Sequence, residues 1–333
     1  MRAPYLLFLG DAALVGMDKM AAGIARWRAR DCLAQYRLPG CAFDTGLPDM
    51  TPAEAAAAGA GTMVIGVVNV GGVIPDAWVA KIVAALEAGL DVAAGMHQRL
   101  ADMPAIAEAA RRCGRTIHDV RQPTRRFATG TGAKRSGKRL LTVGTDCAVG
   151  KKYTALAIEA ELRARQVDAD FRATGQTGLL IAGRGVVIDA VIADFISGAA
   201  EWLSPAAAAD HWDVIEGQGS LAHPAYAAVT LGLIHGSQPD ALVICHEPGR
   251  ETLLGLDYPV PSLNALAEMA LNAAHLTNPA ARAVGISINS SAVPEDALDA
   301  LVAGIEAETG LPCCDPIRQG VGKIVDLLLA PAA

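Results

Sequence analysis

The chain has 333 residues and a formal net charge of −7, from 28 basic and 35 acidic side chains. This length predicts two domains, because a single hydrophobic core rarely grows so large. Hydrophobic residues make up 52% and charged ones 19%, which excludes a disordered chain. The acidic balance argues against a nucleic-acid partner, since such a protein usually carries a basic face.

The apolar opening, MRAPYLLFLG, predicts a buried first strand. Gly10-Asp11 interrupts the run and no small-x-small cleavage pattern follows, so we do not expect a signal peptide. No uninterrupted apolar stretch of about 18 residues occurs, which predicts that the chain has no membrane partner. Seven cysteines without CxxC pairs indicate reduced thiols and a cytoplasmic protein. The apolar composition favours a homo-oligomer of unspecified order.

Short apolar runs alternate with helical patterns, as in βαβ units around a parallel sheet. Residues 1–123 are expected to form a Rossmann-like domain. Its predicted strands are Tyr5–Leu9, Thr62–Asn69, Asp91–Ala94 and Thr116–Asp119. Its predicted helices are Lys19–Ala29, Asp76–Ala88 and Pro104–Cys113.

Residues 124–138, TRRFATGTGAKRSGK, are polar, basic and glycine-rich, which predicts a linker. Two interpretations stay open for it, a solvated connection or a segment that lines an anion site. A P-loop NTPase-like domain is predicted over residues 139–333. Its expected helix is Lys151–Arg165, and its expected strands are Arg139–Val143, Ala169–Ala173, Trp212–Ile215, Ala241–Cys245 and Ala283–Ile288. The predicted fold class is therefore α/β, with two parallel sheets.

Polar sequences follow four strands of the second domain: TGQTG, EGQGS, HEPGR and NSS. The carboxyl ends of parallel strands meet at one edge of a sheet, where ligands of open α/β sheets bind. We expect the ligand crevice of this domain at that edge.

The segment LLTVGTDCAVGKKYT places a glycine-bearing turn between a buried strand and a helix, which is the context of a phosphate-binding P-loop. Backbone N–H groups and the positive helix end would face an anion, and Lys151 would reach its phosphates. The predicted cofactor-binding residues of the loop are Gly144, Thr145, Asp146, Cys147, Ala148, Val149, Gly150, Lys151, Lys152, Tyr153 and Thr154.

This loop departs from G-x-x-x-x-G-K-[ST] in two places. Gly144 comes one residue early, and Lys152 stands where nucleotide hydrolases carry the hydroxyl that holds Mg²⁺. A second ammonium group neutralises phosphate charge without a metal. The change therefore predicts phosphates that are held rather than transferred. The seven histidines show no ligand spacing, so no metal is expected.

Read together, GTDCAVGKKYT, ATGQTG, AVIADFISGAAE and EGQGSLAHPAY resemble the DgcN-type D-glutamate N-acetyltransferases. AQYRLPGC, GVVNVGGVIP and GLDVAAGMHQRL extend the resemblance over about residues 5–325. It implies acetyl transfer from acetyl-CoA to the amine of D-glutamate, in D-glutamate catabolism. The P-loop half is also similar to dethiobiotin synthetase. An Mg-ATP-dependent ligase or kinase, or a non-catalytic nucleotide-binding protein, therefore stays open as an alternative.

Acetyl transfer to an amine requires a base and donors that stabilise an oxyanion. Glu216, which follows the strand Trp212–Ile215, is a candidate base or ammonium anchor, and the alternative is a solvated carboxylate. Asp194 and His223 are the other catalytic candidates. A helix N-cap is the alternative for Asp194, and a hydrogen-bonded loop histidine is the alternative for His223.

Further candidates lie at the other strand ends. Gln176 is predicted to contact the cofactor and Thr177 the substrate. Arg250 would bind a substrate carboxylate or else form an ion pair. Asn289 would contact the cofactor or cap a turn. Cys147, near a helix N-terminus, leaves an acetyl-cysteine intermediate open beside direct transfer.

Overall fold

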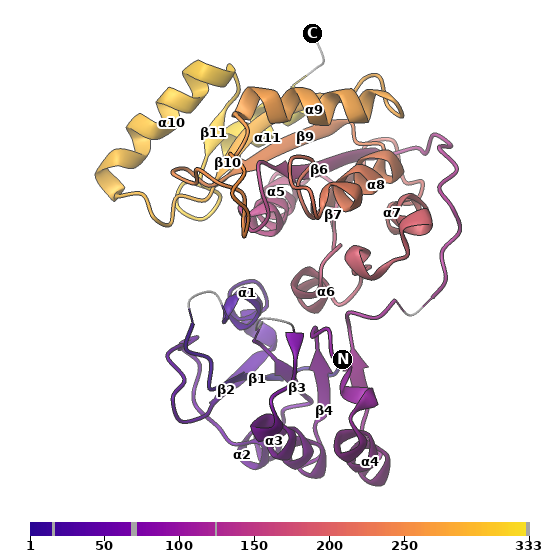
Figure 1. Ribbon diagram of the computed structural model, residues 1–333, viewed down its shortest axis with the longest axis vertical. Helices are drawn as coiled ribbons and strands as arrows, with labels where there is room; N and C mark the ends of the chain where they lie inside the picture. Colours follow the sequence, from indigo (N-terminus) through magenta and orange to yellow (C-terminus); the bar gives the residue numbers. More distant parts are fainter. Residues whose placement is uncertain (15–16, 68–71, 124, 331–333) are drawn as a thin grey trace. The chain divides into compact units, whose positions relative to one another are not determined.

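A computed structural model describes residues 1–14, 17–67, 72–123 and 125–330. The chain divides into two compact units, Met1–Thr124 with Leu179–Gly183, and Arg125–Gly178 with Arg184–Ala333. Each unit contains one all-parallel sheet with helices packed on it (Figure 1), which confirms the predicted fold class. Within the described part of the chain, no helix is both long and apolar enough to cross a bilayer.

The first unit has a five-stranded sheet in the order β2-β1-β3-β4-β5. The strands are β1 Tyr5–Gly10, β2 Cys32–Arg37, β3 Thr62–Ile65, β4 Asp91–Ala94 and β5 Ile117–Asp119. The helices are α1 Lys19–Trp27, η1 Ala29–Asp31, α2 Pro52–Ala57, α3 Asp76–Glu87, η3 Leu100–Asp102 and α4 Pro104–Cys113. Every residue of β1 is buried, as its apolar sequence predicts.

The sequence patterns miss β2 and α2. β2 is an edge strand whose residues are mostly half-buried, so it lacks a continuous apolar run. α2 does carry a readable signal: Thr51 and Glu54 form a capping box, with proline at the first helical position. β3 ends earlier than the predicted Thr62–Asn69, and residues 68–69 lie outside the described residues.

The second unit has a six-stranded sheet in the order β11-β10-β9-β6-β8-β7. The strands are β6 Lys138–Gly144, β7 Ala169–Arg172, β8 Trp212–Ile215, β9 Ala241–His246, β10 Arg282–Ile288 and β11 Cys313–Cys314. The helices beyond β6 are α5 Lys151–Ala164, α6 Gln176–Ala182, η4 Ile188–Ala190, η5 Ala193–Phe195, α7 Ile196–Leu203, α8 Ala227–Ser237, α9 Leu263–His275, α10 Glu295–Thr309 and α11 Gly322–Leu329. Of α6, only the start belongs to the second unit, since Leu179–Gly183 belong to the first. Because the strands are parallel, their carboxyl ends emerge at one edge, as predicted.

Residues 125–137 contain no helix or strand and are mostly exposed, as the solvated-connection interpretation predicts, but they contact the second unit at specific points. The backbone N–H of Thr131 donates to the Glu201 carboxylate on α7 at 2.8 Å. Gly198 of α7 lies so close that a Cβ atom there would be 1.9 Å from the carbonyl oxygen of Ala128. These contacts attach the basic segment to α7 of the second unit.

A buried charge network lies at the amino end of β8. Asp213 accepts hydrogen bonds from Arg172 Nε at 2.6 Å and from His211 Nε2 at 3.1 Å. His211 Nδ1 lies 2.7 Å from the Asp168 carboxylate. Burial lowers the pKa of His211, but its hydrogen bonds to the two carboxylates outweigh this effect and raise that pKa above its usual value.

This network predicts a pH-dependent stability. A histidine whose pKa is raised by folding stabilises the native state fully below its unfolded pKa of about 6.5, and this contribution is lost as the pH rises through the folded pKa. The free energy of unfolding in urea should therefore fall as the pH rises above about 6.5 and through the raised pKa of His211. His211→Gln should lower stability by about 1–3 kcal/mol at the lower pH and flatten this dependence. An unchanged pH slope in the variant would show that another group is responsible.

Candidate phosphate-binding site

The loop between β6 and α5 has the backbone of an anion-binding turn. Ala148 has φ of 58° and Gly150 has φ of 103°, so the chain enters the left-handed region twice before α5 begins at Lys151. Such alternation points successive backbone N–H groups to one concave side. Gly150 is the N-cap and supplies no side chain to the first turn of the helix. The loop therefore offers main-chain donors and a positive helix end to an anion.

Close backbone packing joins this loop to the end of β8. A Cβ atom on Gly217 would lie 1.7 Å from the Thr142 carbonyl oxygen. The Gly217 N–H donates to Thr142 Oγ1 at 2.9 Å, and this hydroxyl donates to the Lys151 carbonyl at 3.2 Å. A Cβ atom on Gly144 would lie 2.8 Å from Val149 Cγ2. Neither glycine can be enlarged without moving the loop.

Lys151 places its ammonium group inside the loop. Its Nζ donates to the carbonyl oxygen of Asp146 at 2.7 Å, and burial lowers the pKa of Lys151. A phosphate oxygen would be a stronger acceptor than this carbonyl, because the hydrogen bond would be charge-assisted on both sides. Lys152 Nζ lies 4.5 Å from the ring centroid of Tyr153, and its charge also acts on Glu216.

Asp146 is fully buried, and its carboxylate stabilises the loop through hydrogen bonds. Its Oδ2 accepts from Arg250 Nη1 at 2.8 Å and from the Leu254 N–H at 2.7 Å, and its Oδ1 accepts from the Cys147 N–H at 2.6 Å. Arg250 also donates to the Cys147 carbonyl at 2.7 Å and pairs with Glu247. The ion pair that the sequence left open for Arg250 is thus formed, and its contact with a substrate stays a prediction.

Glu216 is buried behind the loop, with 3% of its surface exposed, so the solvated-carboxylate alternative is wrong. Its Oε2 accepts from the backbone N–H groups of Thr174 at 3.0 Å and Gly175 at 3.1 Å. A Cβ atom on Gly178 would lie 2.1 Å from the same oxygen. Burial raises the pKa of Glu216, and the charge of Lys152 partly opposes the effect. A buried carboxylate of raised pKa at a ligand edge is a candidate general base.

His223 lies beside the loop, which sequence spacing did not indicate. Ligand-type atoms of His223, Cys147 and Asp146 all lie within 4.8 Å of one another. His223 Nε2 donates to the Leu254 carbonyl at 3.1 Å, and Nδ1 accepts from the Ala225 N–H at 3.2 Å, which fixes the neutral tautomer. The hydrogen-bonded alternative for His223 is therefore what the structure shows. A metal here would have to replace these bonds, and a metal-free site stays a prediction.

Asp194 is exposed on η5. Its N-cap interpretation is wrong, because Ile192 is the N-cap of η5 and Phe195 that of α7. Among the described contacts, none joins Asp194 to the phosphate loop. Its part in catalysis stays a prediction.

Asn289, after β10, does lie beside the loop. A Cβ atom on Gly150 would be 3.9 Å from Asn289 Cβ. The Asn289 side-chain oxygen accepts from the Ser291 N–H at 3.4 Å, so the turn-capping contact is present. Gln176 and Thr177 are half-buried at the start of α6, directly after Gly175. Contacts of these three residues with a ligand remain predictions.

The two loop threonines bond within the protein. Thr145 Oγ1 lies 3.0 Å from His246 Nδ1 at the end of β9. Thr154 Oγ1 donates to the Gly150 carbonyl at 3.2 Å and shares a 2.7 Å hydrogen bond with Ser287 Oγ. These contacts join the loop to β9 and β10 on one side of β6, while the bond of Gly217 to Thr142 joins β6 to the end of β8 on its other side.

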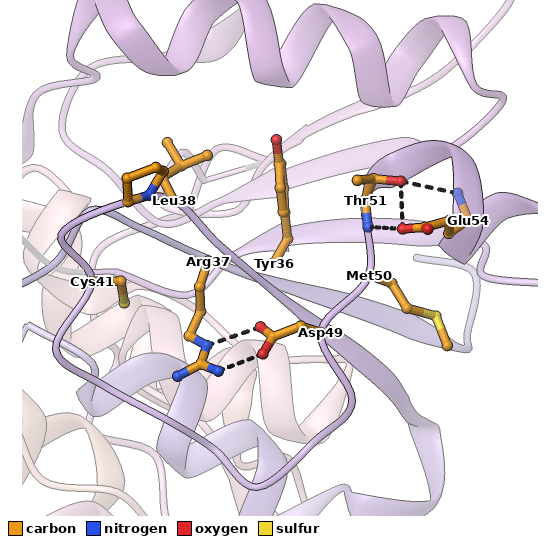
Figure 2. Close-up of a pocket in the computed structure, with 9 residues that line it drawn as sticks. Tyr36, Arg37, Leu38, Cys41, Asp49, Met50, Thr51 and Glu54 are labelled. Atoms are coloured by element: carbon orange, nitrogen blue, oxygen red, sulfur yellow. Dashed lines mark hydrogen bonds and ion pairs between the residues drawn. The ribbon is translucent and has the colours of Figure 1, made fainter.

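A separate cavity of about 420 Å³ lies in the first unit, beside the end of β2 (Figure 2). Its charged lining groups are engaged with one another or with neighbours. Arg37 pairs with Asp49 and Asp44, and the Glu54 carboxylate accepts from the N–H and hydroxyl of Thr51. We therefore place the candidate site at the phosphate loop.

The loop geometry predicts how a diphosphate binds. Lys151→Met should weaken the binding of inorganic pyrophosphate in EDTA at least about tenfold, because one charge-assisted hydrogen bond is lost. Calorimetric titration measures this change. Lys323→Met is the matched control, since Lys323 sits in an exposed ion pair with Glu306. Equal affinity in the Lys151 variant would remove that side chain from the binding site.

Comparison with known proteins matches both units. Residues 126–325 match the model described as "Domain of unknown function (DUF1611_C) P-loop domain", and residues 36–123 match the DUF1611_N Rossmann-like domain. The crystal structure of a DUF1611 family protein from Anabaena variabilis ATCC 29413 superposes with a TM-score of 0.88 at 30% identity. That superposition covers 98% of this chain and 99% of the other.

Two curated relatives extend over nearly the full length. A protein of Tritonibacter scottomollicae named D-glutamate N-acetyltransferase is 52% identical over 98% of both chains. One of a Pseudoalteromonas species, with the same name, is 49% identical over 97% of this chain and 98% of its own. These matches confirm the resemblance found in the sequence motifs. The chain belongs to the DUF1611 family, with a Rossmann-like N-terminal domain and a P-loop C-terminal domain.

Proposed function

We propose that this chain transfers the acetyl group of acetyl-CoA to the amine of D-glutamate. The observation that carries the proposal is 52% identity, over 98% of both chains, to a relative named for that reaction. The phosphate loop supports it independently, because it offers two adjacent lysines where a metal-binding hydroxyl would stand in a nucleotide hydrolase.

The loop residues fit the diphosphate of coenzyme A. Backbone N–H groups before α5 and the positive end of that helix would bind the phosphate oxygens. The ammonium of Lys151, now 2.7 Å from the Asp146 carbonyl, is positioned to exchange that acceptor for a phosphate. Lys152 adds a second positive charge. On this proposal the phosphates anchor the cosubstrate while the chemistry takes place at its thioester.

The reaction forms a bond between the amine nitrogen and the thioester carbon, and it breaks the carbon–sulfur bond. The amine must lose a proton, and the departing thiolate must gain one. We assign the amine proton to Glu216. Its Oε2 is held by the Thr174 and Gly175 N–H groups, so Oε1 is the oxygen that we expect to receive it. Gln176 and Thr177, next along the chain, are the proposed donors to the oxyanion.

Direct transfer is favoured over an acetyl-cysteine intermediate. Burial raises the pKa of the Cys147 thiol, which disfavours the thiolate needed for attack. His223 cannot readily take the thiol proton, because its Nδ1 accepts from Ala225 and its Nε2 already carries a proton. The amine therefore attacks the thioester itself on this proposal.

The proposed setting is the cytoplasm, with a homo-oligomeric enzyme. All seven cysteines are free, which suits a reducing compartment. Several large apolar side chains are exposed on the second unit, among them Met269 and Leu276 of the α9 region, and a second copy could cover them.

The direct test is release of free thiol from acetyl-CoA. We expect release with D-glutamate, much less with L-glutamate, and no loss of rate in EDTA. Mass spectrometry should find one acetyl group on the amino-acid nitrogen. Mg²⁺-dependent ADP formation from ATP, without thiol release, would instead establish the ligase or kinase alternative. Release with another amine alone would retain the reaction class and reject the substrate.

Replacement of Glu216 tests the base. Glu216→Gln should lower kcat about 10²–10⁴-fold with a small change in the KM of acetyl-CoA. The raised pKa predicts a wild-type kcat that falls as the pH drops through it, because the base must be ionised. This limb should vanish in the variant. Glu161→Gln, which removes one member of an ion pair with Arg165 on α5, is the control. A retained acid limb in Glu216→Gln would reassign the base.

A further inference from the structure

Three large apolar side chains are exposed in two segments that contact the phosphate loop. Tyr226 precedes α8 with 46% of its surface exposed, and Leu254 and Tyr258 lie in the segment after β9 with 51% and 58% exposed. The two ends of that segment pair with each other, since the Leu253 N–H donates to the Tyr258 carbonyl at 2.8 Å. We call Tyr226, Leu254 and Tyr258 the apolar lip.

Hydrogen bonds hold the lip against the phosphate loop. The Leu254 N–H donates to the buried Asp146 carboxylate at 2.7 Å, and the Leu254 carbonyl accepts from His223 Nε2 at 3.1 Å. The ring of His223 lies 4.6 Å from that of Tyr226, centroid to centroid. Leu254 and Tyr226 therefore both adjoin His223, whose ring also approaches Cys147 of the loop. The exposed apolar side chains of Leu254 and Tyr226 are therefore close to residues of the phosphate loop.

We propose that the apolar lip binds the pantetheine arm of acetyl-CoA. This inference rests on the proposed function, which places the diphosphate of the cosubstrate in the adjoining loop. The arm leaves the diphosphate as a largely aliphatic chain that carries two methyl groups and two amides. Large apolar side chains would cover its aliphatic parts, while its amides could stay in water.

The apolar lip is continuous with the phosphate loop, which favours the pantetheine arm as its ligand. The carboxylate of Asp146 contacts both parts of the proposed site, because it accepts from Cys147 in the loop and from Leu254 in the lip. A ligand fixed by its phosphates must begin its arm close to this point. Among the described contacts of this unit, none joins its other exposed aromatic or leucine side chains to Asp146.

The test compares ligands with and without the arm, in the full chain. Leu254→Ala keeps the backbone groups that bond Asp146 and His223, and Tyr226→Ala removes the second side chain of the lip. We expect each variant to raise the Kd of coenzyme A about five- to tenfold by calorimetry and to leave the Kd of ADP unchanged, because ADP has the diphosphate and lacks the arm. Leu276→Ala, an exposed leucine after α9, should change neither value.

The other outcomes are decisive as well. An equal loss of affinity for both ligands would mean that the lip only supports the loop, and unchanged affinity for coenzyme A would mean that the arm lies elsewhere. Altered oligomeric state with unchanged affinity would assign the lip to a contact between copies. A last outcome is that the variants weaken coenzyme A binding and leave ADP binding unchanged while the wild type releases no thiol with D-glutamate. In that case the proposed function is wrong, but the lip is still the binding site of the pantetheine arm.

Discussion

The phosphate loop depends on a buried carboxylate. A negative charge inside an anion-binding turn opposes the ligand, yet Asp146 is fully buried there. Its oxygens accept hydrogen bonds from Arg250 and from two backbone N–H groups, so the charge is offset within the protein. Removing a single partner of such a buried pair is costly, because the remaining charge stays unpaired. The loop can thus keep a fixed shape while its lysines and helix end remain the dominant charges for a ligand.

Asp213 and Glu216, two buried carboxylates on or next to β8, have different surroundings. Asp213, the second residue of β8, accepts hydrogen bonds from Arg172 and His211. At the carboxyl end of that strand, Glu216 is held by backbone N–H groups from the neighbouring strand end. Both carboxylates are buried, but only the second adjoins a ligand edge. Burial raises the pKa of Glu216 above its ordinary value, which makes its carboxylate a stronger base.

Tight backbone approaches explain why small residues recur at this edge. Gly217 and Gly178 have no space for a Cβ atom, against Thr142 and Glu216 respectively. Gly217 packs the segment after β8 against β6, and Gly178 packs α6 against the segment after β8, so each contact joins parts distant in sequence. Substitution at either position would have to displace the carboxylate or the loop, so their role is geometric and not merely one of flexibility.

Much of the fold could be predicted from local sequence patterns. The strands β4 and β8 and the phosphate loop follow from apolar runs bounded by glycine, because such signals lie within a few residues. The edge strand β2 escaped because only its middle is buried, and the bonds of residues 125–137 to α7 depend on partners some 70 residues away. The pairing of Arg250 with Asp146 escaped for the same reason.

The sequence by itself determined that a lysine-rich phosphate loop follows a buried strand, and that polar residues follow its neighbours. Only the tertiary structure decided which of those residues meet. It brought His223 to Cys147, enclosed Glu216 within the protein, and left Asp194 exposed. Chain periodicity specifies which face of an element is buried, whereas contacts between loops are set by strand order and by the path that each loop takes after its strand.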